Sequence, residues 1–340
     1  LEARDVLEKR GQKLLEELYG KSGVDDNLKR YEAVLNGFLK EFGEKDVKMF
    51  SSPGRTEISG NHTDHNNGKV LGGSINLDCV AAAAKNDSDF VNIISESFSQ
   101  KFRVNIKDIE PGTDKIGTIE LLKGILAGFE QRGASIGGFD AYITSNVISS
   151  AGVSSSAAFE TLICQIINTL FNEGKLSKTD YAYIGKYAEN NYWDKASGLL
   201  DQMCCAYGGL ISIDFANPDL PKVEELDFDF AGAKHDLIIV QTGRGHADLS
   251  ADYSSIPAEM KKVAEFFGKS TLSEVNEDEF YNNLSKIRDF AGDRAVLRSI
   301  HFFDENKRVD NEIKALKSND FDSFLKNITD SGNSSWKYLK

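Results

Sequence analysis

Several features that would place the chain in a specialised class are missing from its sequence. No stretch approaches the roughly 20 consecutive apolar residues that a membrane-spanning helix needs. Lys and Arg number 40 against 53 Asp and Glu, which gives a net charge of -13 and no basic excess for nucleic acid. We therefore expect neither a membrane nor a nucleic acid as partner. An acidic protein can still bind phosphate locally, at the N-terminus of a helix.

Cysteine is also scarce, and the spacing CxxC does not occur. The four cysteines lie in apolar surroundings, at Cys79, Cys164, Cys204 and Cys205. Buried free thiols in a reducing compartment are the simplest interpretation. Residues 1–20 have the pattern of an amphipathic helix rather than of a signal peptide. Together these features predict a cytoplasmic protein.

The rest of the composition is that of an ordinary globular protein, with 40% hydrophobic and 27% charged residues. A length of 340 residues favours two domains. Hydrophobic periodicity predicts helices over residues 1–43, 119–133 and 177–193, over most of 257–326, and within 149–171, where the apolar stripe runs from Phe159 to Leu170. It predicts strands over residues 69–86, 90–97 and 138–148, in the last residues of 197–215, and a buried strand over 234–243. This mixture indicates an α+β protein with a domain boundary near residue 200.

The first polar segment is "GRTEISGNHTDHNNG", residues 54–68, which directly precedes an apolar run. Asn66, Asn67 and Gly68 are typical of a solvated turn. His62 and His65, together with Asp64, are candidate metal ligands, although a His-x-x-His spacing in a loop without a helix or a third ligand is a weak signal. Unpaired polar side chains between two apolar segments are costly, and a sugar satisfies them well because its hydroxyls both donate and accept.

The second polar segment is "SSAGVSSSAA", residues 149–158, which leads into a strongly periodic helix. Backbone N–H groups at a helix N-terminus lack intrahelical partners, so this loop is a candidate phosphate site. The alternative is that Ser154, Ser155 or Ser156 simply caps the helix. No Lys follows the glycines, so the segment is not a P-loop.

The third polar segment is "SGLLDQMCCAYGG", which places Asp201 before an apolar helix. The simplest role for a carboxylate at this position is a helix cap. Close to an arginine, it would instead be able to accept a proton from a hydroxyl nucleophile.

In this order, the segments resemble the galactokinase branch of the small-molecule kinase superfamily that also holds homoserine, mevalonate and phosphomevalonate kinases. "GRTEISGNHTDHNNGKVL" resembles the galactokinase signature, "GVSSSAA" the phosphate loop, and "SGLLDQ" the segment Cys-Gly-Ile-Met-Asp-Gln. "HADLSADY" and "HFFDENKRV" resemble two further family motifs. The resemblance covers about residues 30–340.

The resemblance implies an N-terminal domain of ribosomal-protein-S5 type over residues 1–199 and a ferredoxin-like domain over 200–340, with the site between them. It implies transfer of the ATP γ-phosphoryl group to the C1 hydroxyl of a sugar. Asp201 would be the catalytic base, kept ionised by Arg55, which would also stabilise charge in the transition state. The resemblance implies that the sugar is bound by Asn61, His62, Asp64, Gly198 and Tyr253. It implies that the ATP phosphates are bound by Gly152, Ser154, Ser155 and Ser156. It also implies that Mg²⁺ is bound by Ser156 and Glu189. We expect a monomer.

One departure from the family pattern bears on the sugar. The glutamate that precedes His-Thr-Asp in the family is Asn61 in this chain. A neutral amide would tolerate a C6 carboxylate that glutamate repels, so galacturonate is an alternative to galactose. Asn61 can equally hydrogen-bond a C6 hydroxyl, and Glu57 can compensate from four residues earlier.

Other departures concern the phosphate loop and the C-terminal domain. Ile148 and Ser150 replace a proline and a glycine, which predicts a stiffer loop. The arginine that follows the family's tyrosine is missing after Tyr253. The sequence ends before the family's glycine-rich segment, so we expect the C-terminal domain to lack its last strands.

Two other classes of function compete with a sugar-1-kinase. The first is a non-catalytic sugar sensor of the galactokinase fold, which would not need Asp201 as a base. The second is a mevalonate- or homoserine-type kinase, which the cluster His62-Thr63-Asp64 disfavours because it suits a polyol better than a carboxylate-bearing chain.

Overall fold

The computed structural model describes residues 9–113, 116–149, 151–193, 197–230, 232–240 and 250–339. The chain forms two compact units. Unit 1 is made from Leu1–Arg55 and Ser74–Tyr207, and unit 2 from Thr56–Gly73 and Gly208–Lys340. The predicted domains, 1–199 and 200–340, are continuous stretches and stay a prediction. The compact units are discontinuous because strands β1 and β2 each pass from one unit into the other.

Unit 1 combines a sheet with helices. Its strands are β3 (Phe90–Ser95), β4 (Gln100–Asn105), β5 (Phe139–Ser145) and parts of β1 (Lys48–Ser59) and β2 (Lys69–Lys85). Its helices are α2 (Lys9–Tyr19), α3 (Val24–Phe42), α4 (Thr118–Gln131), α5 (Ser155–Phe171), α6 (Lys178–Tyr192) and α7 (Leu200–Tyr207), with a 3₁₀ turn η1 (Lys21–Gly23). The strand order in this unit is β4-β3-β5-β2, with β1 paired to β2. β3 and β5 are parallel, whereas β3–β4 and β2–β5 are antiparallel.

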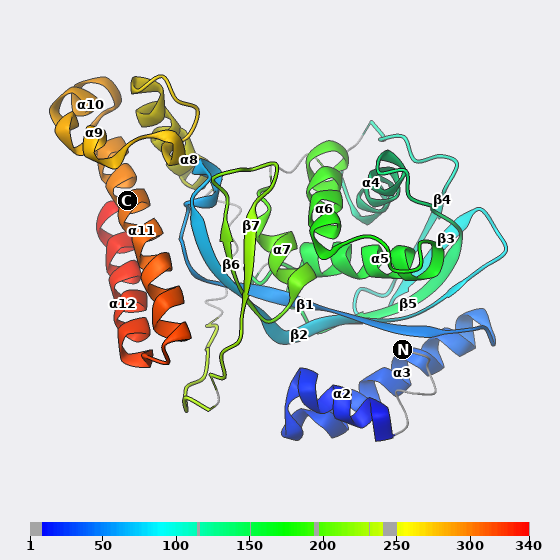
Figure 1. Cartoon of the computed structure of the whole chain (residues 1–340). Helices are drawn as coiled ribbons and strands as arrows, with labels where there is room; N and C mark the ends of the chain where they lie inside the picture. Colours follow the sequence, from blue (N-terminus) through cyan, green and yellow to red (C-terminus); the bar gives the residue numbers. More distant parts are fainter. Residues whose placement is uncertain are drawn as a thin grey trace. The chain divides into compact units, whose positions relative to one another are not determined.

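Strand β2 is buried on both faces, which explains its uninterrupted apolar run. Ala81 and Ala83 pack into the core that α4, α5 and α6 cover. Val80 and Ala82 point the other way, into a second core formed with α2 and α3. Figure 1 shows these two helix groups on opposite faces of the unit 1 strands. The predicted strand at 69–86 is confirmed.

Unit 2 is mostly helical. Its strands β6 (Leu210–Asp214) and β7 (Lys222–Leu226) continue antiparallel from the first residues of β2 in the order β2-β6-β7. Its helical elements are η2 (Asp64–Asn66), α8 (Ser250–Phe266), η4 (Leu272–Glu274), α9 (Glu277–Asn282), α10 (Leu284–Ala291), α11 (Asp293–Lys317) and α12 (Phe321–Tyr338). Helices α11 and α12 lie side by side (Figure 1). This unit has two hydrophobic cores. One contains Met260, Phe280 and Phe302, and the other contains Leu71, Val309 and Phe324.

Most of the predicted elements are confirmed, including the α+β class and, from Lys9 onward, the helices predicted over residues 1–43. Residues 1–8 lie outside the described residues. Ser177 caps the N-terminus of α6 and forms a capping box with Asp180. Helix α4 ends one residue before Arg132, and Gly133 follows with a positive φ of 67°. All four cysteines are buried and free, as expected.

The strand predicted over 234–243 is wrong for the residues that the structure describes. Residues 235–240 have no strand assignment, and residues 241–243 lie outside the described ranges. Leu237, Ile238 and Val240 are 47%, 79% and 77% exposed. An apolar run indicates a tendency to be buried, but a strand also needs a backbone partner. Within the described residues, β7 ends at Leu226 and no strand pairs with this segment.

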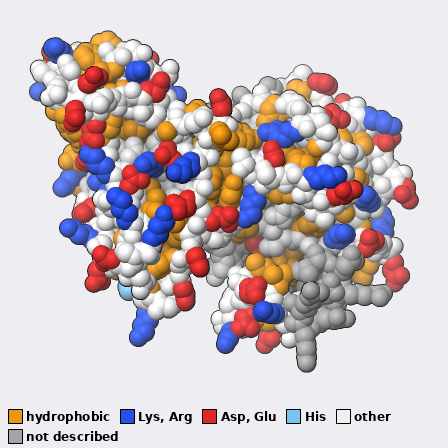
Figure 2. All heavy atoms as spheres, in the orientation of Figure 1, with side chains coloured by type: hydrophobic (Ala, Val, Ile, Leu, Met, Phe, Trp, Pro, Cys, Tyr) orange, Lys and Arg blue, Asp and Glu red, His pale blue; other side chains and the backbone are white. Residues whose placement is uncertain are grey.

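The surface in Figure 2 carries acidic and basic side chains interspersed with one another. Among the described helices, none combines the length and the hydrophobicity that a membrane crossing requires.

Candidate active-site residues

Arg55 and Asp201 form an ion pair within unit 1. Arg55 lies in β1 and Asp201 in the first turn of α7, and Nε and Nη2 of Arg55 lie 2.8 and 2.7 Å from Oδ1 of Asp201. Arg55 also donates from Nη1 to the Gly152 carbonyl at 2.5 Å, and its backbone N–H donates to the Val153 carbonyl at 3.1 Å. A Cβ on Gly54 would lie 2.7 Å from the Val153 oxygen. Glycine at this position therefore lets β1 approach the serine loop.

Ser154 connects the serine loop to the same carboxylate. It is the N-cap residue of α5 in a left-handed conformation, with φ 57° and ψ 57°, and its side chain does not cap the helix. Its hydroxyl instead donates to Oδ2 of Asp201 at 2.5 Å. Asp201 thus accepts from Arg55 on one oxygen and from Ser154 on the other. The capping alternative is wrong for Ser154, and the first-turn N–H groups of α5 receive no hydrogen bond from its side chain.

The other serines of the loop lead to a buried carboxylate. Ser155 is the first residue of α5, and the Ser156 hydroxyl donates to Oε1 of Glu189 at 3.0 Å. Glu189 lies on α6 and is 1% exposed. Its Oε2 accepts from the Ser197 hydroxyl and, at 3.0 Å, from Nε2 of Gln202.

Gly198 lies two residues before the start of α7 and belongs to the same unit as the serine loop. Ile148 is 46% exposed. Ser150, whose replacement of a glycine predicts a stiff loop, lies outside the described residues.

The predicted sugar segment forms a tight turn in unit 2. Gly60 has φ 97°, and a Cβ there would lie 2.5 Å from the Lys69 carbonyl oxygen. The Thr63 hydroxyl bonds to the carbonyls of Gly60 and Lys69 at 2.9 and 2.7 Å. Buried Asn66 ties the turn to its surroundings, because its Oδ1 lies 3.4 Å from the Leu272 N–H. The turn is therefore internally bonded and not merely a solvated loop.

His62 and Tyr253 meet within this unit. Their rings pack edge-on with centroids 5.1 Å apart, and Tyr253 lies on α8 with 54% of its surface exposed. Burial lowers the pKa of His62, an effect that the nearby Asp64 carboxylate opposes. His62 is therefore neutral at neutral pH and able to donate and accept at once. Asp64 lies 3.9 Å from Nε2 of His65.

Asn61 is held by the helix pair α11 and α12. Its Nδ2 lies 3.3 Å from the hydroxyl oxygens of Ser331 and of Ser335. Its backbone carbonyl accepts from Nε2 of His301 at 2.9 Å. Within the described ranges no group of three or more His, Cys, Asp or Glu side chains is arranged to bind a metal ion, so the metal alternative for His62, Asp64 and His65 gains no support.

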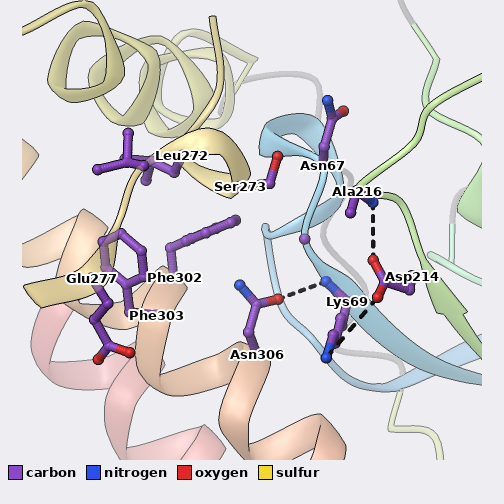
Figure 3. A pocket seen from close by; sticks show the side chains of 12 residues that line it. Asn67, Lys69, Asp214, Ala216, Leu272, Ser273, Glu277, Phe302, Phe303 and Asn306 are labelled. Atoms are coloured by element: carbon purple, nitrogen blue, oxygen red, sulfur yellow. Dashed lines mark hydrogen bonds and ion pairs between the residues drawn. The ribbon is translucent and has the colours of Figure 1, made fainter. Parts of the chain in front are cut away.

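A pocket of about 250 Å³ adjoins the end of the turn (Figure 3). Asn306 accepts from the Lys69 backbone N–H at 2.6 Å, and Lys69 Nζ lies 4.0 Å from an oxygen of Asp214. Phe302 and Leu272 supply apolar walls. None of the residues predicted to bind a sugar lines this pocket.

Comparison with known proteins identifies the family. The model "Galactokinase galactose-binding signature" matches residues 36–85, and "GHMP kinases N terminal domain" matches residues 120–209. A galactokinase of Clostridium perfringens (strain 13 / Type A) is 30% identical over 84% of this chain and 74% of its own length. The chain belongs to the galactokinase family.

Two further relatives support this assignment. A galactokinase of Clostridium tetani is 29% identical over 86% of this chain and 74% of its own length. The crystal structure of Lactococcus lactis galactokinase complexed with galactose matches with a TM-score of 0.79 at 25% identity, covering 91% of this chain and 80% of that one. The predicted two-domain small-molecule kinase fold is confirmed.

Sequence reasoning missed several side chains that hold the predicted residues in place. Gln202 stands in the segment "SGLLDQ", and His301 and Glu305 stand in "HFFDENKRV", but the motifs gave them no role. Ser331 and Ser335 lie in no motif, and their contact with Asn61 depends on the packing of α12.

Proposed function

We propose that the chain transfers the γ-phosphoryl group of ATP to the C1 hydroxyl of galactose. The observation that carries the proposal is the position of Asp201 in the first turn of α7, where it is held between Arg55 and Ser154. Ser154 is the N-cap residue of α5, the helix that follows the serine loop. Asp201 accepts the C1 hydroxyl proton while that oxygen bonds to the γ-phosphorus. The bond from the γ-phosphorus to the β,γ-bridging oxygen breaks and ADP leaves. Arg55 stabilises the negative charge of the transition state.

The serine loop is our candidate for the ATP phosphates. Gly152, with φ 72°, and the first turn of α5 offer backbone N–H groups and the positive end of the helix dipole. Gly152, Ser154, Ser155 and Ser156 would contact the phosphates.

Ser156 and Glu189 suit Mg²⁺, because their oxygens already lie 3.0 Å apart and Mg²⁺ prefers a few protein oxygens together with phosphate and water. Bound there, Mg²⁺ would offset the negative charge of the phosphates.

The turn in unit 2 is our candidate for sugar recognition. Asp64 accepts hydroxyl hydrogens, neutral His62 can donate or accept, and Tyr253 adds an exposed ring beside His62. Asn61 and Gly198 complete the predicted sugar residues. A cytoplasmic location and a monomeric state remain predictions.

Replacing Asp201 with alanine tests the proposal. We expect Asp201→Ala to lower kcat for galactose phosphorylation by about 10²–10⁴-fold, because it removes the proton acceptor. Galactose binding, measured by calorimetric titration, should change little because Asp201 lies outside the turn. Asp108→Ala, at an exposed carboxylate of unit 1, is the matched control. Wild-type chain that binds galactose and ATP without turnover would favour the sugar sensor, and an active Asp201→Ala variant would refute the role of Asp201.

A further inference from the structure

Asn61 faces helix α12 through a chain of hydrogen bonds that begins at a buried carboxylate. Glu305 is 0% exposed, and its Oε1 accepts from the Gly60 N–H at 3.0 Å and from the Ser331 hydroxyl at 2.5 Å. Its Oε2 accepts from Nε of Arg308 at 2.6 Å. Burial alone would raise the pKa of Glu305, but these hydrogen bonds and the Arg308 charge outweigh it and lower the pKa. Glu305 is therefore an ionised group that only accepts hydrogen bonds.

This fixes the direction of the next hydrogen bond. Because Glu305 cannot donate, the single hydroxyl hydrogen of Ser331 points to Glu305. The Ser331 oxygen is then left to accept, and it lies 3.3 Å from the Asn61 amide. An amide turned the other way would place its oxygen against the lone pairs of Ser331. The Asn61 side chain therefore presents Nδ2 to Ser331 and to Ser335, which lies at the same distance.

The direction of the hydrogen bond at the Asn61 backbone carbonyl can be assigned in the same way. Burial lowers the pKa of His301, so the ring is neutral. A carbonyl can only accept, hence Nε2 of His301 carries the hydrogen that the Asn61 carbonyl receives at 2.9 Å. Nδ1 then accepts from the Ser334 hydroxyl at 2.9 Å. The backbone carbonyl and the side-chain nitrogen of Asn61 are therefore both hydrogen-bonded to α11 and α12.

One polar atom of the Asn61 side chain is left for a ligand, its Oδ1, which no donor among the described residues reaches. We propose that Ser331 and Glu305 act as positioning residues that lock the Asn61 amide with only its oxygen free, so that this position selects a sugar hydroxyl and rejects a carboxylate. A hydroxyl can donate to Oδ1, whereas a carboxylate would oppose it with a second set of lone pairs. The proposal rests on the proposed function and names the group at which galactose and galacturonate are distinguished.

The test measures the ratio of galactose affinity to galacturonate affinity by calorimetric titration of the full chain. Wild type should prefer galactose by about 100-fold or more. Ser331→Ala removes the group that orients the amide, so the amide can turn and the ratio should fall at least about tenfold. Ser335→Ala, the matched control on the same helix, leaves the Glu305–Ser331 link intact and should keep the ratio within about threefold.

A purely structural role of Ser331 would weaken both sugars together and leave the ratio unchanged, and that result would overturn the proposal. Equal binding of the two sugars by wild type would also overturn it. If thermal melting shows Ser331→Ala to be unfolded, Ser331→Cys decides, because its thiol has a similar size but is a weak hydrogen-bond acceptor. The ratio should fall in this variant as well, and an unchanged ratio would overturn the proposal. If wild type phosphorylates galactose but Ser331→Ala leaves the ratio of galactose affinity to galacturonate affinity unchanged, only this inference is refuted. Wild type that neither binds nor phosphorylates galactose refutes the proposed function as well.

Discussion

Two buried carboxylates, Glu160 and Glu189, are bridged by the side-chain amide of Gln202. Nε2 of Gln202 lies 3.2 Å from Oε2 of Glu160 and 3.0 Å from Oε2 of Glu189. Glu160 on α5 is 0% exposed, and Glu189 on α6 and Gln202 on α7 are each 1% exposed. A Cβ on Gly185 would come within 2.5 Å of the Glu160 carboxylate, so glycine leaves the room that Glu160 needs. The amide therefore holds in place a carboxylate that we propose as a Mg²⁺ ligand.

Replacing Gln202 with leucine should lower both stability and nucleotide binding. We expect Gln202→Leu to reduce the free energy of unfolding by about 1–3 kcal/mol, because it leaves two buried carboxylates without a shared donor. The extra stability that a non-hydrolysable ATP analogue with Mg²⁺ confers should also shrink, since Glu189 loses its orientation. Urea denaturation with and without the analogue measures both effects. Gln100→Leu, at an exposed position of β4, is the control, and an unchanged Gln202→Leu variant would contradict the bridging role.

For individual residues, sequence motifs made some side-chain contacts predictable and gave no indication of others. Arg55 and Asp201 lie 146 positions apart, yet each stands in a segment that resembles a family motif, so their pairing was predictable. The contacts of Gln202 with Glu160 and of Asn61 with Ser331 arise where helices pack. Helix packing has no fixed spacing along the chain, so a single sequence does not reveal which side chains it joins.

Among the secondary-structure elements, burial on two faces made β2 easy to predict. Its apolar residues need not alternate, because Ala81 and Ala82 enter different cores. The run at 234–243 also contains consecutive apolar residues, Leu237 to Val240, but residues 235–240 are not a strand. The composition of a segment indicates whether its side chains prefer to be buried. Strand pairing depends instead on which other backbone segment lies alongside, and the sequence of the segment itself does not contain that information.

Helix α11 carries a carboxyl group in an unfavourable environment. Glu312 is 0% exposed, and within the described chain neither of its carboxyl oxygens has a hydrogen-bond partner. Burial raises the pKa of Glu312 from 4.5 to about 8. The nearby Ser59 hydroxyl, which donates to Glu305 at 3.2 Å, opposes this shift, and the charge of Glu305 adds to it. The folded protein therefore keeps this side chain protonated at neutral pH.

This shifted group predicts how stability depends on pH. Between pH 4.5 and about 8 the folded state holds a proton that the unfolded chain releases, so the Glu312 contribution to stability falls as pH rises. The Glu312→Gln side chain stays neutral, so the free energy of unfolding of this variant relative to wild type should increase by about 4 kcal/mol from the acid to the alkaline end of this range. Urea denaturation across the range measures the gain, with the exposed Glu265→Gln as control. A stability difference that is constant with pH would mean that Glu312 is ionised in the folded protein.

For the whole molecule, the predicted site residues fall into two groups by compact unit. The residues proposed to bind phosphate and to accept the proton belong to unit 1, together with Gly198. The residues Asn61, His62, Asp64 and Tyr253 belong to unit 2. A prediction that divides the chain once, at residue 199, cannot separate these groups, because residues 56–73 join unit 2 through long-range contacts such as that of Gly60 with Glu305.

This division predicts a separation that hydrogen exchange can measure. Galactose alone should slow amide exchange in residues 58–68, and an ATP analogue with Mg²⁺ should slow it in residues 151–157. At a ligand concentration about 100 times Kd, protection of up to about 100-fold is expected where binding must be released before exchange. Glucose, which differs from galactose in the configuration of one hydroxyl, is the matched control and should give much less protection. If galactose protected 151–157 and left 58–68 unchanged, the turn would not be the sugar-binding segment. The hydrogen bonds that hold Asn61 and Thr63 would then be purely structural.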